Sequence, residues 1–148
     1  MTKFTENPSE EAVGAWARLI RVSQGLLSQV EADLKGAGFP VLSWYDALLE
    51  LRRAGTSGLR PFQLQEQMLL AQYGLSRLVD RLDRAGYVHR MPNAQDGRGQ
   101  VLRITPEGRN LLKRMWPVYR NAIQAHFAAR ISDRETVELA KILGKFRG

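Results

Sequence analysis

The feature that most constrains the fold is a pair of short amphipathic helical segments followed at once by a β-hairpin. In the second segment, residues 72–85, apolar side chains recur at helical spacing and form one stripe that must be buried. They are Leu75, Leu78, Val79, Leu82 and Ala85. Two strand-like runs come next, GYVHR and QVLRIT, and between them lie Asp96, Arg98 and two glycines. Two helices and a hairpin in this order predict a winged helix-turn-helix.

Longer helices are predicted before this pair from the residues at their ends. Ser9 is a suitable cap for a long first helix, which ends near Gly36. Ser43 is expected to cap the second helix, with Asp46 three residues later in the place of a capping-box acid. Gly55 is the expected stop of that second helix.

The remaining helix starts are equally well marked. Pro61 fits the first turn of a third helix, because the amide proton that proline lacks would be unpaired there anyway. Thr105 and Pro106 together predict the start of a long fifth helix after the hairpin. Ser132 and Glu135 form a complete capping box for a last helix.

Charge is distributed unevenly along the chain, whose formal net charge is +7. Residues 72–105 hold 6 basic and 3 acidic residues, and all of the basic ones are arginine. Arginine binds phosphate groups and guanine edges through two parallel hydrogen bonds, whereas lysine offers a point charge. The bias therefore suits a polyanion as partner. A surface that is basic only for solubility is the alternative.

The polar face of the segment 72–85 has the residue types that read DNA in a major groove. Its candidates for DNA contact are Gln72, Tyr73, Ser76, Arg77 and Arg81. Arginine pairs with guanine and glutamine with adenine, while serine and tyrosine bond to bases or backbone. Alternatively, the acids and arginines of this face simply pair with one another.

The hairpin that follows would lie over the adjacent minor groove, where negative potential is concentrated. We expect Arg98 to contact DNA there and Asp96 to hold the guanidinium group of Arg98 in place. An ordinary surface turn that merely uses favourable turn residues is the alternative.

The stretch Leu75 to Gly108 resembles the MarR family of bacterial winged-helix regulators. The family pattern runs from a Ser/Thr-Arg recognition helix through DRLE..G.V.R to a D-x-R wing and an L-T-x-x-G strand end. The matching positions are Ser76, Arg77, Asp80, Arg81, Leu82, Gly86, Val88, Arg90, Asp96, Arg98, Ile104, Thr105 and Gly108. The resemblance extends more loosely over nearly the whole chain.

The resemblance implies a homodimer whose terminal helices interlock. The sequence agrees, because the first and the last two helices carry more apolar surface than one small winged-helix core can bury. The predicted interface residues are Trp16, Leu112, Trp116, Tyr119, Ile123, Ile142, Leu143 and Phe146. A bundle closed within one chain is the alternative.

We therefore expect a mainly α fold with a small β-hairpin wing, in one MarR-like domain over residues 1–148. The winged helix-turn-helix lobe is expected at 40–104, and the helical dimerisation region at 9–36 and 106–148. Such a dimer would act on double-stranded DNA as a transcriptional regulator, in the simplest case a repressor, at a pseudo-palindromic operator. A winged helix used for general DNA coating or for protein contact is the alternative.

The resemblance also implies a small effector, often an aromatic acid or a phenol, bound near the junction of the dimer helices and the lobe. Arg18, Trp44 and Tyr45 are the candidates for lining such a pocket. Aromatic residues at helical spacing are more often part of a core, so that alternative stays open.

Other classes of protein find little support in the sequence. The chain has no cysteine and only two histidines, so no metal site or cofactor is expected. We find no phosphate-binding loop and no nucleophile arrangement of an enzyme. The N-terminus lacks the features of an export signal, and no apolar run approaches the roughly 18 residues of a membrane span. A cytoplasmic protein is the resulting expectation.

Overall fold

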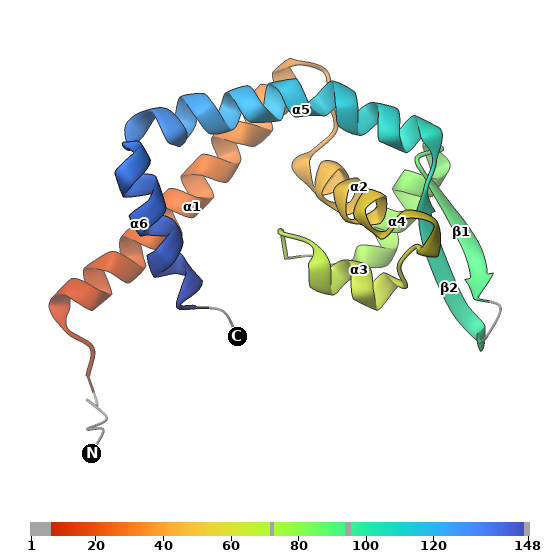
Figure 1. The fold of residues 1–148 in the computed structure, drawn as a ribbon, viewed down its shortest axis with the longest axis horizontal. Coiled ribbons are helices and arrows are strands. Elements are labelled where there is room, and N and C mark those ends of the chain that lie inside the picture. The colour runs from red at the N-terminus through yellow and green to blue at the C-terminus, as the bar shows by residue number, and fades with distance from the viewer. Residues whose placement is uncertain (1–6, 72, 94–95, 147–148) are drawn as a thin grey trace. The chain divides into compact units, whose positions relative to one another are not determined.

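The computed structural model describes residues 7–71, 73–93 and 96–146, without the side chains of residues 93 and 96–98. In these residues helices dominate, and one antiparallel hairpin follows the fourth α-helix (Figure 1). The elements are α1 (Glu10–Gly36), α2 (Leu42–Ala54), η1 (Gly55–Ser57), α3 (Pro61–Gln67), α4 (Leu75–Arg84), β1 (Val88–Asn93), β2 (Asp96–Ile104), α5 (Pro106–His126), η2 (Ala128–Arg130) and α6 (Asp133–Gly144). The predicted fold class is confirmed.

The chain forms two compact units. One unit, residues 33–121, contains α2, α3, α4, the hairpin and the first part of α5, and is called the lobe below. The other combines residues 1–32 with 122–148 and is called the helical unit. The lobe is larger than the predicted 40–104, because Leu111, Leu112 and Met115 of α5 are buried in its core.

The core of the lobe draws on every one of its major elements. Its fully buried large side chains are Leu34, Leu48, Leu51, Leu64, Leu82, Val88, Leu102, Leu111, Leu112 and Met115. Four of the five residues predicted as the buried stripe of α4 are buried, namely Leu75, Leu78, Val79 and Leu82. Ala85 is the exception, because it lies beyond the last helical residue and is exposed.

Three of the four predicted helix caps are observed. The Oγ atom of Ser9 accepts the amide proton of Ala12 at 3.0 Å, and Thr105 Oγ1 accepts that of Gly108 at 3.0 Å. Ser132 and Glu135 form the reciprocal bonds of a capping box, at 3.1 and 2.9 Å.

The predicted cap of the second helix is wrong. α2 begins at Leu42, so Ser43 lies within its first turn, and Val41 precedes the helix without a side-chain cap. Asp46 then falls too far along the helix to reach its amide groups, and it has other partners, described below. The end of α2 is as expected, since Gly55 follows it with a φ of 63°.

The hairpin pairs Val88 with Ile104, and an irregularity follows Pro92. Leu59 forms an isolated β-bridge with Leu102 of β2 through two backbone hydrogen bonds, at 3.0 and 2.7 Å. Gly58 makes this approach possible, because a Cβ atom there would lie 2.5 Å from the carbonyl oxygen of Leu102. The base of the hairpin is thus held against the start of α3.

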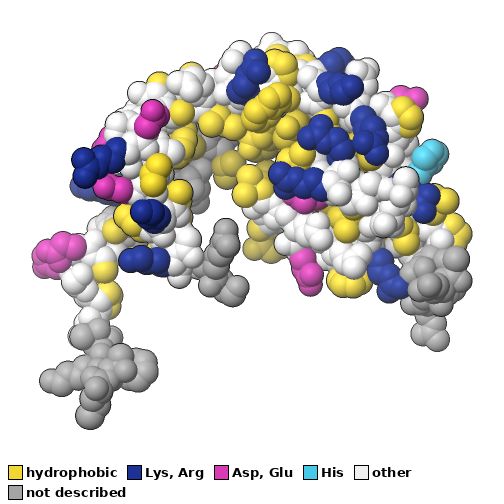
Figure 2. Space-filling view, in the orientation of Figure 1, with side chains coloured by type: hydrophobic (Ala, Val, Ile, Leu, Met, Phe, Trp, Pro, Cys, Tyr) yellow, Lys and Arg dark blue, Asp and Glu magenta, His cyan; other side chains and the backbone are white. Residues whose placement is uncertain are grey.

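The helical unit buries very little apolar surface by itself. Among its described hydrophobic residues, only Val30 and Ala122 are buried. Figure 2 shows hydrophobic side chains reaching the surface along this unit. Its large exposed apolar residues are Val13, Trp16, Leu19, Ile20, Val22, Leu27, Val137, Ile142, Leu143 and Phe146.

Candidate nucleic-acid interface

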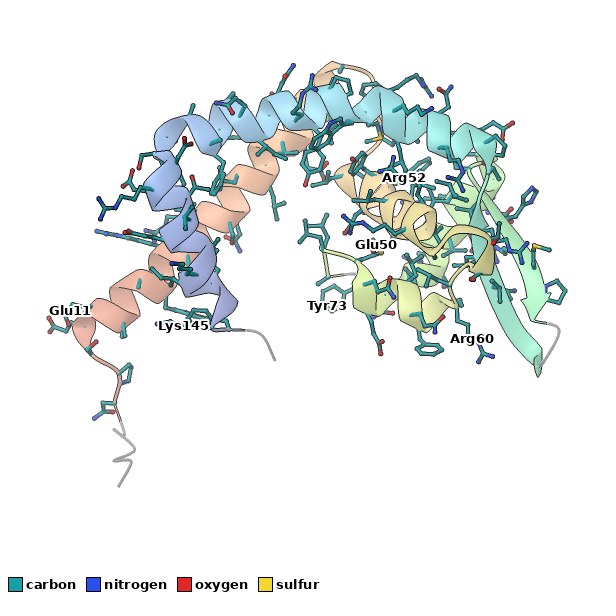
Figure 3. All side chains as sticks on the ribbon, viewed as in Figure 1. Glu11, Glu50, Arg52, Arg60, Tyr73 and Lys145 are labelled. Atoms are coloured by element: carbon teal, nitrogen blue, oxygen red, sulfur yellow. The ribbon has the colours of Figure 1, made fainter. Side chains whose placement is uncertain are left out.

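The helix predicted to read DNA begins later than the sequence indicates. Gly74 precedes α4 with a φ of 84°, a left-handed conformation that favours glycine, and its carbonyl oxygen accepts the amide proton of Arg77 at 3.1 Å. Tyr73 therefore lies before the helix and not in it, and its side chain is fully exposed (Figure 3). Gln72, the other residue predicted at the helix start, lies outside the described residues.

The polar face of α4 is nevertheless arranged as predicted. Ser76, Arg77, Arg81 and Arg84 are all exposed, and the buried leucine stripe lies on the opposite side of the helix. Because the lobe holds the apolar side, these four side chains project from a fixed helix axis. Such a face can bond to bases and phosphates along one groove.

The acids of α4 pair across to the hairpin and not with the arginines of the helix. Arg90, on β1, bonds through Nη2 to Asp80 Oδ1, and its Nε lies 3.4 Å from Asp83 Oδ2. In the described part of the chain, no ion pair involves Arg77 or Arg81. The expected alternative of pairing within the helix is therefore wrong, and the arginine charges remain available for a polyanion.

The importance of Arg90 is not evident from the sequence, where it is one of the positions that match the MarR-family pattern. A usable signal was present, because Asp80 and Asp83 are three residues apart and so share one side of the helix. One strand arginine can face both carboxylates from there, which makes a cation partner on the neighbouring strand a reasonable expectation.

The hairpin backbone places its predicted residues differently from expectation. Asp96 and Arg98 belong to strand β2, which begins at Asp96, and residues 94–95 lie outside the described residues. The proposed support of the Arg98 guanidinium by Asp96 concerns side chains that also lie outside the description. Both residues therefore remain predicted DNA contacts.

Asp46 is predicted as a capping-box acid of α2 but has a different role in the structure. It is 6% exposed, and its two carboxylate oxygens accept the amide protons of Leu69, at 2.9 Å, and Leu70, at 2.7 Å. Both partners lie in the segment that joins α3 to α4. No local pattern indicates such bonds, because the partners are 23 and 24 residues away along the chain.

The sequence profile of the MarR family matches residues 33–99. The transcriptional regulator PecS of Dickeya dadantii (strain 3937) is 29% identical over 129 residues, which cover 82% of this chain and 77% of PecS. The chain is therefore similar to MarR-family regulators, with the family profile matching its central part. Its fold, a helix-turn-helix followed by a β-hairpin, is that of the winged-helix regulators.

Solved structures of MarR-family regulators share this fold. Sco3205 from Streptomyces coelicolor, solved in complex with DNA, superposes with a TM-score of 0.84 at 23% identity, covering 96% of this chain and 89% of Sco3205. A mutant of MarR from E. coli, complexed with operator DNA, gives 0.79 at 22% identity, covering 96% and 100%. At these identities the likeness concerns the fold.

The residues predicted for the MarR-like dimer interface fall into two groups. Trp16, Ile142, Leu143 and Phe146 lie in the helical unit and are 66%, 52%, 43% and 75% exposed, while Ile123 is half-buried. The other three, from the first part of α5, lie in the lobe: Leu112, Trp116 and Tyr119.

Leu112 does not fit the prediction, because it is buried in the core of the lobe and has no free surface. Trp116 and Tyr119 pack on Tyr45 of α2 in the same chain, with ring centroids 6.4 and 5.1 Å from that of Tyr45. Trp116 still exposes 41% of its surface. This aromatic cluster therefore packs α5 against α2 within the lobe and leaves part of Trp116 exposed.

The predicted effector residues are not a single cluster on one unit. Arg18 belongs to the helical unit, while Trp44 packs edge-on against Tyr87 in the lobe, with centroids 6.0 Å apart. Tyr45 is buried but borders a surface hollow of about 330 Å³, which Asp46, Leu69, Leu70 and Tyr119 also line. Of the three predicted residues, Tyr45 alone borders this hollow.

Two phenols, those of Tyr45 and Tyr119, line this hollow. Burial raises the pKa of the Tyr45 hydroxyl, and the nearby Arg52 and Arg53 oppose part of that rise. Burial also raises the pKa of Tyr119, and the negative charge of Asp46 adds to it. Both shifts keep the hydroxyls neutral to a higher pH than that of an ordinary tyrosine.

Among the described residues, no three histidine, cysteine or acidic side chains stand close enough to hold a metal ion. No described helix is both long and apolar enough to cross a membrane.

Proposed function

We propose that this chain is a MarR-family regulator, a homodimer that binds a pseudo-palindromic operator and represses the adjacent genes. In this proposal α4 enters the major groove, the β1–β2 hairpin reaches the neighbouring minor groove, and a small aromatic or phenolic effector controls binding. The observation that carries it is the face of α4, where Ser76, Arg77 and Arg81 are exposed and no described carboxylate pairs with the arginines.

The chemistry of that face favours DNA over other partners. The guanidinium group of Arg77, in the first turn of α4, suits two hydrogen bonds to guanine O6 and N7. Arg81 lies one turn later on the same side and suits a phosphate group. Sco3205 and E. coli MarR, which share the fold, were both solved with DNA.

The homodimer proposal rests on the helical unit. Helices that leave residues such as Trp16, Ile142 and Phe146 exposed cannot form a stable unit alone, because each exposed apolar side chain forgoes its burial energy. A second copy supplies the same apolar surfaces, so a two-fold arrangement covers both at once. Two copies of α4 would then face successive turns of the duplex.

Control by a ligand finds support in the hollow beside Tyr45 and Tyr119. Its two protonated phenols donate hydrogen bonds, and its leucines offer apolar contact, which suits a small aromatic molecule with oxygen acceptors. A ligand there would weaken DNA binding only by preferring a dimer geometry that does not match the groove spacing.

The test replaces Arg77 by alanine and measures binding to a duplex that the wild-type chain selects from random-sequence DNA. We expect a loss of about 1–3 kcal/mol on that duplex, concentrated at one base position in each half-site. The melting temperature should not change, because the side chain is exposed.

Arg134→Ala is the matched control, since Arg134 is an exposed arginine of α6 in the helical unit. It should bind the selected duplex as the wild type does. If Arg77→Ala instead weakens binding equally on every sequence, Arg77 contacts only phosphate, and general DNA coating becomes the better account.

A further inference from the structure

The described residues of the segment between α3 and α4 make few contacts that fix their position. Met68 closes α3, donating its amide proton to Leu64 at 3.0 Å, and its side chain is buried. Leu69, by contrast, is 75% exposed and Tyr73 is fully exposed, so apolar burial does little to hold the chain between Met68 and Leu75. The path of this segment decides where α4 begins.

Asp46 holds that segment through two hydrogen bonds. Its carboxylate accepts two amide protons from consecutive residues, Leu69 and Leu70, just after the helical hydrogen bonds of α3 have ended. Such bonds to an ionised, buried group are shorter and stronger than bonds between neutral groups. Asp46 itself is fixed, since it lies on α2 between the buried Tyr45 and Ala47. The carboxylate thus connects the rigid core helix α2 to the turn of the helix-turn-helix.

We propose that Asp46 is a positioning residue for operator recognition: it holds the α3–α4 turn so that the arginine face of α4 meets the base edges in register. This inference rests on the proposed function. Base contacts need placement within about 0.5 Å, whereas phosphate contacts tolerate a looser helix. Loosening the turn should therefore reduce preference for the operator more than it reduces general DNA affinity.

Asp46→Asn is the first test, because the amide keeps the shape but has one oxygen acceptor in place of two. The measurement compares affinity for a duplex selected by the wild-type chain with affinity for an unrelated duplex of equal length, well below the melting temperature. We expect the first to fall about tenfold or more and the second to change by less than about twofold.

Glu50→Gln is the matched control. Glu50 lies one turn later on α2 and is also buried, but its carboxylate bonds to Arg53, at 2.8 Å, and not to the turn. It should leave both affinities unchanged. If Asp46→Asn lowers only the melting temperature and keeps the ratio of the two affinities, Asp46 is merely structural and the inference is overturned.

Asp46→Glu keeps the inference testable should the asparagine variant not fold. It preserves the charge but moves the oxygens by about one C–C bond, roughly 1.5 Å. A folded glutamate variant should lose operator preference, and one that retains it would overturn the inference. If the wild-type chain itself prefers no duplex, the proposed function fails, which is a different result from an unchanged ratio in the variants.

Discussion

At the scale of single residues, Gly74 shows how one backbone angle sets the start of a functional helix. Its φ of 84° turns the chain into α4, and a Cβ atom there would meet nothing closer than the Arg77 side chain, at 3.9 Å. Space is therefore available for a larger residue, and the constraint lies in the backbone conformation alone.

Gly74→Ala should destabilise the chain by about 1 kcal/mol, because alanine adopts the left-handed conformation at that cost. It should also weaken binding to a selected duplex, since the first turn of α4 carries Ser76 and Arg77. Thermal unfolding followed by circular dichroism measures the first effect.

Gly36→Ala serves as the comparison. Gly36 is the last helical residue of α1, without a positive φ and with open space around it, so alanine there should be neutral or stabilising. Equal effects at both glycines would show that the left-handed conformation of Gly74 is not needed.

At the scale of elements, the link between β1 and α4 determines the charge that the helix presents. Arg90 occupies the carboxylates of Asp80 and Asp83, which would otherwise stand among the arginines of α4. Arg90 thereby neutralises these two carboxylates, and the electrostatic potential of the exposed arginine face of α4 stays positive.

Arg90→Gln should weaken DNA binding several-fold at low salt, because two unpaired carboxylates would then repel the phosphates. The effect should shrink as potassium chloride is raised, while the melting temperature falls only slightly, as for other part-exposed ion pairs. Affinity measured over a salt series gives both quantities.

Adding Asp80→Asn and Asp83→Asn to Arg90→Gln should restore much of the lost affinity, since the repelling charges are then gone. If the triple variant binds no better than Arg90→Gln alone, the carboxylates do not act on DNA, and Arg90 matters only for holding the hairpin.

Much of the fold was predictable because its signals are local. The caps at Ser9, Thr105 and Ser132 need only neighbouring residues, and the leucine stripe of α4 follows from helical spacing. Where the structure differs, the deciding partner is distant. Asp46 looks like a capping acid until Leu69 and Leu70 are brought beside it.

The candidate site shows the same limit. Exposed arginines of α4 could be predicted from periodicity, but that no described carboxylate pairs with them depends on Arg90, which only the folded hairpin brings to Asp80. Likewise, apolar spacing marks Leu112 and Ile142 equally, although the lobe buries the first and leaves the second exposed. Burial against a tertiary neighbour cannot be inferred from spacing along one helix.

At the scale of the whole molecule, the two units differ in the surface that they expose. The lobe is a well-packed body with a cationic helix face, while the helical unit exposes most of its large apolar residues. A second copy of the chain would cover the exposed apolar side chains of the helical unit. It would also supply a second cationic face. DNA with two-fold symmetry is the partner that such a pair of faces fits.

Selection of duplexes from random-sequence DNA by the wild-type chain tests this account most directly. We predict that the enriched sequences form one inverted repeat, with half-site centres about 10 base pairs apart, as two copies of α4 on one side of the duplex require. A pool without any enriched motif, bound with steep salt dependence, would contradict a dedicated operator.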